Sequence, residues 1–284
     1  MKKTMKLMAL VLALATLFAL MAGCSGGEKK DVIVLGTSAD YPPFESMALN
    51  SDLEGKYDEI VVANGKEPNS YYGIDIAMAK AVAKKMGKEL QIVNMSFDNL
   101  ITALGKGEID FVIAAMEKDG EREKGATPSD PYYTDLPAMI LVKAGDMTTY
   151  KTLNDFAGKK VGAQTATTKE AIVKDDMPGA ELVSLQVVTD MINQLVNGKL
   201  DALVLDGAVA VQYAQNNKEL AIADASSELG EALPYCVAVA KGDPQGLLPG
   251  INAAIADMVA NKKVEQFIAD ADALADVAVE VSAE

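Results

Sequence analysis

Short apolar runs alternate with amphipathic segments along most of the chain. Runs such as Leu90–Asn94 and Ala202–Leu205 have the length and composition of strands. Segments such as Gly73–Met86 place apolar residues every three or four positions and stop at a glycine, as amphipathic helices do. This alternation predicts α/β layers with largely parallel sheets. The predicted strands are Asp31–Thr37, Leu90–Asn94, Ile109–Ala114, Ala138–Lys143, Lys160–Ala163, Glu181–Leu185, Ala202–Leu205 and Tyr235–Lys241; the predicted helices are Gly73–Met86, Phe97–Leu104, Thr168–Asp175, Thr189–Val196, Ala208–Gln215, Ile251–Ala260 and Val264–Ala269.

Two features modify this pattern. The polar stretch Asn50–Ser70 interrupts the alternation and contains the hairpin-type turn Asn64-Gly65, so we expect a surface insertion. The segments Leu104–Asp110 and Leu195–Asp201 resemble each other, because each has a glycine that ends a helix and an aspartate that precedes a strand. The similarity suggests two related α/β lobes, although such turns also recur by chance in α/β proteins.

The N-terminus has the features of an export signal. Lysines precede the apolar stretch Leu7–Ala22, which is short for a spanning helix and is followed by Gly23-Cys24 and a polar linker. We predict a signal peptide over residues 1–23 and a linker over 24–30. The segment Met21–Cys24 resembles a bacterial lipoprotein signal-peptidase box, which usually has leucine where Met21 stands. That resemblance implies a lipid on Cys24 and an extracytoplasmic protein anchored to the bacterial cell membrane, at the cell surface or on the periplasmic side. An ordinary secretory signal is the alternative.

The composition excludes several classes of function. The chain has 284 residues and a net charge of −15, and the signal would remove three lysines and no acid, leaving −18. Such a charge argues against nucleic acid as a partner. The absence of histidine excludes Ser-His-Asp and Cys-His catalysis and histidine-ligated zinc. We therefore expect no catalytic residue, no metal and no cofactor. With Cys24 lipidated, Cys236 has no disulfide partner and is expected to be a small buried apolar residue.

Arg122 is the only arginine among the 26 lysines and arginines of the chain. A planar guanidinium grips a carboxylate with two parallel N–H donors, which lysine does poorly. The neutral alternative is a surface arginine that is present by chance.

The segment Gly36–Glu45 follows the first predicted strand, and its prolines at 42 and 43 fix a rigid loop. Open α/β sheets bind their ligands at this carboxyl end of a strand. The segment resembles the opening motif of the polar amino-acid-binding proteins of ABC importers, the bacterial extracellular solute-binding family 3. Further similar motifs cover essentially the whole mature chain: Gly73–Ile76, Phe97–Leu104, Gly107–Asp110, Glu121-Arg122, Ser129–Tyr133, Leu153–Gly162, Leu200–Ala202 with Asp206, and Val239–Pro244.

The resemblance implies a two-lobed type II periplasmic-binding-protein fold, with mixed, mostly parallel sheets flanked by helices. Two hinge crossings are expected near Thr134–Ala138 and Glu231–Pro234, so that residues 31–134 and 235–284 form lobe 1 and residues 135–234 form lobe 2. The implied function is to bind an amino acid, with polar or cationic ones favoured, by lobe closure, and to deliver it as a monomer to a membrane ABC permease. The alternatives on the same fold are a cyclohexadienyl dehydratase-like enzyme and a sensory ligand-binding domain.

The resemblance also implies the roles of individual residues. Arg122, with Thr167 and Thr168, would hold the ligand α-carboxylate, while Asp206 and the backbone of Ala115 would hold the α-ammonium. Tyr41 and Phe97 would enclose the ligand side chain. Structural alternatives remain for three of them: Thr167–Glu170 also has the pattern of a helix capping box, Asp206 of a strand-end cap, and Phe97 of a core residue.

Three positions depart from the family pattern. Glu117 replaces a threonine or serine, and it could receive a cationic group, serve as the acid of an enzyme, be a surface charge, or pair with Arg122 or a lysine. Ala166 replaces a glycine, so the backbone there is expected to be less free to take a positive φ. Ser38 stands where binders of cationic amino acids tend to have aspartate, which weakens that assignment, while Glu117 and Asp135 favour it.

Overall fold

The computed structural model describes residues 31–48, 61–63 and 70–281. The predicted signal peptide, the linker, Cys24 and most of the expected insertion at Asn50–Ser70 lie outside these residues. Among the described residues, no helix is long and apolar enough to cross a membrane.

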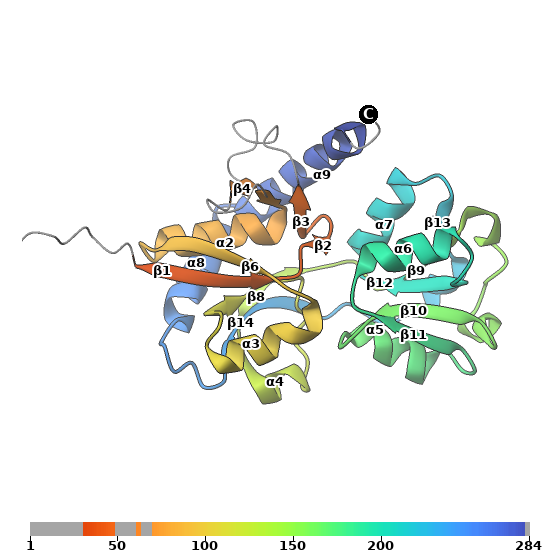
Figure 1. Ribbon diagram of the computed structural model, residues 1–284, viewed down its shortest axis with the longest axis horizontal. Coiled ribbons are helices and arrows are strands. Elements are labelled where there is room, and N and C mark those ends of the chain that lie inside the picture. The colour runs from red at the N-terminus through yellow and green to blue at the C-terminus, as the bar shows by residue number, and fades with distance from the viewer. Residues whose placement is uncertain (1–30, 49–60, 64–69, 282–284) are drawn as a thin grey trace, which may run out of the picture. The chain divides into compact units, whose positions relative to one another are not determined.

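The first sheet contains five strands in the order β6-β1-β7-β14-β8. The strand β1 pairs in parallel with β6 and β7, whereas β14 runs antiparallel to β7 and β8. The helices α2, α3, α4 and α8 lie with this sheet (Figure 1). The strands are β1 (Val32–Thr37), β6 (Glu89–Asn94), β7 (Phe111–Val112), β8 (Ala126–Thr134) and β14 (Pro234–Ala240), and the helices are α2 (Ile74–Lys85), α3 (Leu100–Lys106), α4 (Arg122–Gly125), α8 (Leu248–Ala260) and α9 (Lys263–Val281).

The second sheet repeats this arrangement in the order β11-β10-β12-β9-β13. The strand β10 pairs in parallel with β11 and β12, and β9 runs antiparallel to β12 and β13. Both sheets are therefore mixed, with their antiparallel pairs formed by the strands that follow a crossing between the sheets. The strands are β9 (Met139–Lys143), β10 (Lys160–Gln164), β11 (Glu181–Leu185), β12 (Ala202–Leu205) and β13 (Leu220–Ile222), and the helices are α5 (Thr168–Ala171), the π-helical turn η5 (Ile172–Asp176), α6 (Val188–Val196) and α7 (Gly207–Asn216).

The two-lobed α/β fold is confirmed, and the chain passes between the sheets twice. It leaves the first sheet after Thr134 and enters the second at Met139, and it returns before Pro234. Pro234 pairs with Thr134, so the first crossing begins next to the point where the second one ends. The lobe boundaries at residues 134 and 234 stay a prediction.

A glycine and an aspartate in each helix–strand turn account for the internal similarity of the sequence. Gly107 and Gly198 both end a helix with a positive φ, 73° and 69°. Oδ2 of Asp110 accepts a hydrogen bond of 2.8 Å from the backbone N–H of Val34, and Oδ2 of Asp201 accepts one of 2.8 Å from Lys160. In both sheets an aspartate therefore fixes the start of one strand to its neighbour.

A four-stranded sheet beside the first lobe carries the Gly36–Glu45 motif. Its order is β2-β3-β5-β4, and Pro42-Pro43, joined by a cis peptide bond, lie between β2 and β3. Gly73, at φ 125°, lets α2 begin directly against this turn, since a Cβ there would lie 2.3 Å from the carbonyl oxygen of Phe44. The contact brings Asp75 beside Glu45. The strands are β2 (Asp40–Tyr41), β3 (Glu45–Ala48), β4 (Val61–Ala63) and β5 (Ser70–Tyr72).

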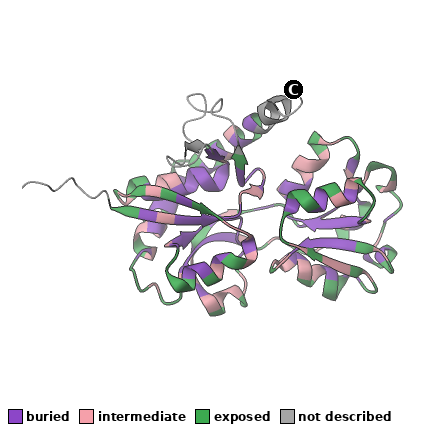
Figure 2. Ribbon diagram, in the orientation of Figure 1, coloured by how far each residue is buried: buried purple, intermediate pink, exposed green. Residues whose placement is uncertain are grey.

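The core lies along the strands of both large sheets. Figure 2 shows these strands mainly buried and the exposed positions mainly on the helices and loops around them. Cys236 in β14 is buried, as predicted. The predicted strand Ile109–Ala114 is also mostly buried, although only Phe111–Val112 pair as a strand.

Candidate functional site

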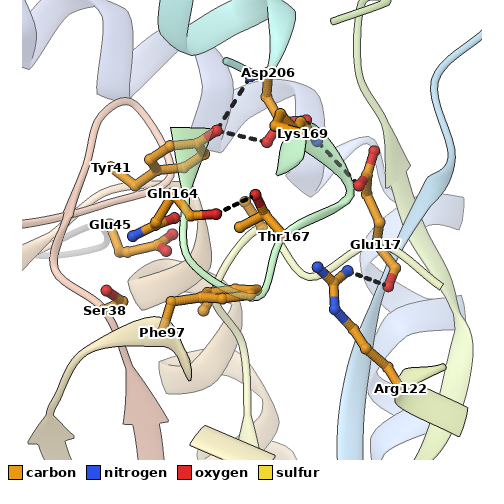
Figure 3. A pocket seen from close by; sticks show the side chains of 12 residues that line it. Ser38, Tyr41, Glu45, Phe97, Glu117, Arg122, Gln164, Thr167, Lys169 and Asp206 are labelled. Carbon is orange, nitrogen blue, oxygen red and sulfur yellow. Dashed lines mark hydrogen bonds and ion pairs between the residues drawn. The ribbon is translucent and has the colours of Figure 1, made fainter. Parts of the chain in front are cut away.

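The candidate site lies where strands of both sheets end. Ser38 follows β1, Phe97 follows β6, Ala115 follows β7, Thr167 follows β10 and Asp206 follows β12. The carboxyl ends of these strands therefore converge on one pocket, as expected for ligand sites of α/β sheets. It is lined by Ser38, Tyr41, Glu45, Phe97, Ala114, Ala115, Glu117, Arg122, Gln164, Thr167, Lys169 and Asp206 (Figure 3).

Arg122 begins the short helix α4 and turns its guanidinium towards the pocket. Nη1 donates to the backbone carbonyl of Glu117 at 2.8 Å, and Nε lies 3.2 Å from Oδ2 of Asp119. Nη2 lies 3.4 Å from the carbonyl oxygen of Ala166 in the second lobe, and the guanidinium carbon lies 5.1 Å from the centre of the Phe97 ring. The side chain is 13% exposed. The guanidinium is thus oriented by four contacts while it still borders the pocket.

The carboxylate of Glu117 contacts lysine and threonine rather than Arg122. Its Oε2 lies 3.0 Å from Nζ of Lys169 and accepts a hydrogen bond from the Thr168 hydroxyl. Of the alternatives left open for Glu117, the pair with a lysine is present, whereas Arg122 contacts only the backbone carbonyl of Glu117. The side chain instead links the first lobe to the start of α5 in the second (Figure 3).

Asp206 is buried at the end of β12, and both of its carboxylate oxygens have partners. Oδ1 pairs with the ammonium of Lys169, and Oδ2 accepts a hydrogen bond of 2.6 Å from the Tyr41 hydroxyl. The backbone N–H of Asp206 in turn donates to the Tyr41 oxygen at 3.1 Å. Burial raises the pKa of Tyr41 well above its usual value, and the Asp206 carboxylate raises it further, so the hydroxyl keeps its proton.

Glu45 and Asp75 form a buried pair of carboxyl groups at the wall of the pocket. Asp75 accepts hydrogen bonds from the backbone N–H of Ala115 at 2.6 Å and from the Tyr132 hydroxyl at 2.8 Å. Burial raises the pKa of Asp75 to about 6, against the effect of these bonds. Burial, and then the neighbouring Asp75, raise the pKa of Glu45 well above its usual value. Glu45 therefore keeps a proton and shares it with Asp75.

One carboxyl oxygen of Glu45 has no partner within this pair of carboxyl groups. Among the described residues, Oε2 of Glu45 has no hydrogen-bond partner, although the side chain is 1% exposed. A buried polar atom without a partner is costly, so its place on a pocket wall indicates a group that comes from outside the chain. Figure 3 shows Glu45 and Ser38 on the opposite side of the pocket from Arg122 and Glu117.

The structure brings together almost all of the site residues named from the sequence. Ser38, Tyr41, Phe97, Ala115, Glu117, Arg122, Thr167 and Asp206 line one pocket, and Thr168 contacts it through Glu117. Phe97 also packs with Leu100 and Met116 in the core of the first lobe, so its two interpretations hold together. The roles of these residues towards a ligand stay predictions.

Three expectations need correction. The capping box at Thr167–Glu170 does not form, because the Thr167 hydroxyl donates to the carbonyl of Gln164 and the Glu170 carboxylate accepts from Ala166. Ala166 takes a φ of 63° although it is not glycine. Asp135 is not among the residues that line the pocket; its carboxylate accepts hydrogen bonds from the Tyr235 hydroxyl and from the backbone N–H of Ala208 instead.

Four residues of the pocket were not assigned from the sequence: Glu45, Ala114, Gln164 and Lys169. Glu45 lies in the opening motif, and Lys169 lies in the segment Thr167–Glu170. Both segments were given a role from the sequence, but these two side chains were not. The burial of each depends on partners far away in the chain, Asp75 for Glu45 and Asp206 for Lys169. A charged residue next to a predicted ligand loop was the signal available for Lys169.

Comparison with known proteins relates the whole fold to one group. Residues 59–270 match the bacterial extracellular solute-binding proteins, family 3. The chain is 32% identical over 256 residues to ABC transporter arginine-binding protein 1 of Escherichia coli (strain K12), covering 89% of this chain and 93% of that protein. It is 30% identical over 274 residues to the arginine-binding extracellular protein ArtP of Bacillus subtilis (strain 168), covering 92% and 96%.

A solved structure of an amino acid ABC transporter substrate-binding protein is also similar to this chain. The substrate-binding protein AbpA of an amino acid ABC transporter from Streptococcus pneumoniae, bound to L-arginine, has a TM-score of 0.75 and 34% sequence identity. The match covers 86% of this chain and 95% of that one.

Proposed function

The chain belongs to the bacterial extracellular solute-binding proteins of family 3, and from that membership we propose that it binds L-arginine outside the cytoplasm and delivers it to an ABC permease. Amino-acid binding of this kind is the function for which E. coli and B. subtilis relatives are named. Arginine is the finer part of the proposal, and it rests on the geometry of the pocket.

The observation that carries the proposal is the buried Glu45–Asp75 pair with its unpartnered oxygen. A guanidinium is planar, stays charged and offers five N–H donors, so it needs several acceptors in one region. Oε2 of Glu45 and the side-chain oxygens of Ser38 and Gln164 are such acceptors at one side of the pocket. Arg122 at the other side suits an α-carboxylate, and Asp206 suits the α-ammonium. The three charged groups of arginine then each meet a group of opposite charge or an acceptor.

Ser38 is compatible with this assignment because Glu45 supplies the acidic group. The replacement of aspartate by Ser38 weakened the prediction of a cationic ligand. Its hydroxyl instead donates to Oδ1 of Asp40 at 3.2 Å, and Glu45 supplies a carboxyl group on the same side of the pocket (Figure 3). The pocket therefore keeps an acid at this side from a different position in the chain.

Lobe closure around the ligand is supported by contacts that join the two sheets. Besides Tyr41–Asp206 and Glu117–Lys169, Oδ2 of Asp40 accepts from the backbone N–H of Val188 at 2.7 Å. Nε2 of Gln186 donates to Asp98 at 2.9 Å. We assign residues 31–134 and 235–284 to lobe 1 and residues 135–234 to lobe 2, with the two crossings as hinges. The protein acts as a ligand carrier in this proposal, without catalysis.

Thermal unfolding with each of the twenty amino acids tests the proposal. A ligand at one hundred times its Kd stabilises the folded state by about 2.7 kcal/mol. The chain has no tryptophan, so dye-based melting and titration calorimetry are the suitable methods. We expect the largest shift with arginine, a smaller one with lysine, and loss of this preference in Glu45→Leu, which removes the acceptor oxygens. A melt that no amino acid shifts, together with turnover of prephenate to a keto acid, would favour the enzyme alternative instead.

We further propose that residues 1–23 are removed and that Cys24 carries the lipid, so that a monomer is held at the outer side of the cell membrane. The support is the lipoprotein-type box around Cys24 and the extracytoplasmic location of the family. Mass spectrometry of the purified N-terminal peptide should find a diacylglyceryl group on Cys24. Cys24→Ser should leave the membrane fraction, and a lipid-free mature protein should run as a monomer in light scattering.

A further inference from the structure

Lys169 is the only buried lysine or arginine among the described residues, and its side chain is 4% exposed. An ammonium in such a place needs partners for all three of its N–H donors, because its hydration is lost. It has them: it pairs with Asp206, lies 3.0 Å from Oε2 of Glu117, and donates to the Thr168 hydroxyl at 3.2 Å. The side chain is therefore held as a specific ligand would be held.

One partner of Lys169, Asp206, is the group that the proposed function gives to the α-ammonium of the ligand. The inference below rests on that proposed function, in which Asp206 receives the α-ammonium of the amino acid. Oδ2 of Asp206 is already bound by Tyr41, and Oδ1 by Lys169. An incoming α-ammonium thus meets a carboxylate whose two oxygens both have partners, and it meets a like charge beside them.

We propose that Lys169 is an internal substitute for the ligand α-ammonium and sets how far binding depends on that group. In the ligand-free protein its ammonium occupies the ammonium subsite made by Asp206 and Glu117. When the amino acid enters, its α-ammonium displaces that of Lys169, so one ammonium–carboxylate pair replaces another. The net contribution of the α-ammonium to affinity is then small.

The positions of the three groups allow this exchange. Lys169 lies in the first turn of α5 in the second lobe, whereas Glu117 follows β7 in the first lobe. Separation of the lobes breaks the Lys169–Glu117 contact and gives the lysine access to water. Two carboxylates and one ammonium also leave the subsite with an excess of negative charge, which attracts a second cation.

The same contacts give Lys169 a second effect. In the absence of ligand, its pairs with Glu117 and Asp206 connect the lobes in the way that a bound amino acid would. Removal of the charge should therefore loosen the ligand-free protein and tighten the complex. A lysine with a purely structural role would change both in the same direction.

The test compares two ligands on matched proteins. The ligands are L-arginine and 5-guanidinopentanoic acid, which has the same carboxylate and guanidinium but no amino group. The proteins are the wild type, Lys169→Met, and Lys174→Met, a control at an exposed lysine of the following η5 turn. Calorimetry gives Kd for each pair, and dye-based melting gives the stability without ligand.

The wild type and Lys174→Met should prefer arginine over the amino-free acid by less than about tenfold. Lys169→Met should melt at a lower temperature without ligand, bind arginine at least about tenfold more tightly, and prefer it by more than about one hundredfold. If the methionine variant does not fold, Lys169→Met combined with Glu117→Gln removes one charge of each sign and keeps Asp206 for the ligand. It should show the same gain in preference.

The outcomes separate this inference from the proposed function. Binding of arginine by the wild type with unchanged or weaker binding by Lys169→Met overturns the role of Lys169 and leaves the proposed function standing. A wild type that already prefers arginine by more than about one hundredfold also overturns it. No binding by the wild type but clear binding by Lys169→Met supports the inference in its strongest form. No binding of arginine by any of these proteins overturns both.

Discussion

The hydroxyl of Tyr41 both donates to the carboxylate of Asp206, at 2.6 Å, and accepts from the backbone N–H of the same residue, at 3.1 Å. Tyr41 belongs to the β2 strand beside the first lobe, and Asp206 ends β12 in the second. A single hydroxyl group thus fixes two polar groups of the opposite lobe. Since both residues are buried, neither group can turn to water instead.

Tyr41→Phe should destabilise the ligand-free protein by about 1–3 kcal/mol, because a buried N–H and a carboxylate oxygen would each lose a partner. Urea unfolding measures this loss. Tyr213→Phe is the control, since Tyr213 is only partly buried in α7, and its hydroxyl should contribute less. Equal stability of wild type and Tyr41→Phe would contradict this role of the hydroxyl.

Arg122→Lys should weaken arginine binding by about 10- to 100-fold, since a charge-assisted hydrogen bond contributes about 1.5–3 kcal/mol and about 1.4 kcal/mol is a factor of ten. Lysine keeps the charge but loses the fork that can hold a carboxylate with two bonds. Calorimetry gives the affinity, and the far-ultraviolet circular dichroism spectrum should stay unchanged, since the fold persists. Lys124→Ala, which removes an exposed pair with Glu121 in the same helix, should bind as the wild type does. Unchanged affinity of Arg122→Lys would remove Arg122 from the carboxylate subsite.

The Glu45–Asp75 pair should make the stability of the ligand-free protein fall as pH rises. Both groups have a higher pKa in the folded than in the unfolded chain, so the folded state binds more protons between those values, and unfolding gains from each rise in pH. For Asp75 the window runs from its ordinary pKa of 3.8 to about 6, and the loss is at most about 3 kcal/mol. The raised pKa of Glu45 adds to this decline in the same direction.

Urea unfolding at several pH values between 4 and 8 measures this decline. Glu45→Gln should make the fall in stability smaller, because only Asp75 of the pair then remains to lose a proton. Glu108→Gln changes an exposed glutamate and should reproduce the wild-type curve. Parallel curves for wild type and Glu45→Gln would mean that Glu45 does not hold its proton in the folded state.

Ala166→Gly should stabilise the protein by up to about 1 kcal/mol, because a residue with a Cβ pays for the left-handed backbone and glycine does not. Its φ of 63° is kept by a hydrogen bond from the backbone N–H to Glu170 and by the contact of its carbonyl with Arg122. Thermal unfolding gives the change. Ala171→Gly, at a helical φ of −63°, should instead destabilise by about 0.5–1 kcal/mol. Destabilisation of similar size by both variants would show that the backbone at Ala166 is not strained.

The sequence predicted best those elements whose pattern is local. The strands Glu181–Leu185 and Ala202–Leu205 have the predicted bounds, because their apolar runs are short and clearly delimited. The strand β8, Ala126–Thr134, was not predicted, since it contains Pro128 and Pro131 and has little apolar periodicity. It forms at the edge of its sheet by pairing with β14, more than a hundred residues later, and an edge strand tolerates proline.

The same limit applies to the candidate site. Loops at strand ends could be found from the sequence, and with them Arg122, Asp206 and the other residues of the motifs. The contacts of Lys169 and Glu45 depend on which distant carboxylates come to lie beside them after folding. Whether these two charged side chains are buried depends on the three-dimensional arrangement, and no spacing within the chain encodes it.

The aspartates at 110 and 201 have a mechanical consequence. Each fastens a strand of its own sheet, one at Val34 in β1 and the other at Lys160 in β10, by a hydrogen bond that stays within its own half. A force that separates the halves is then transmitted to the segments after Thr134 and before Pro234. Pairs of fluorophores placed within one half will keep their separation throughout the transport cycle, and only pairs that bridge the halves will report its stages.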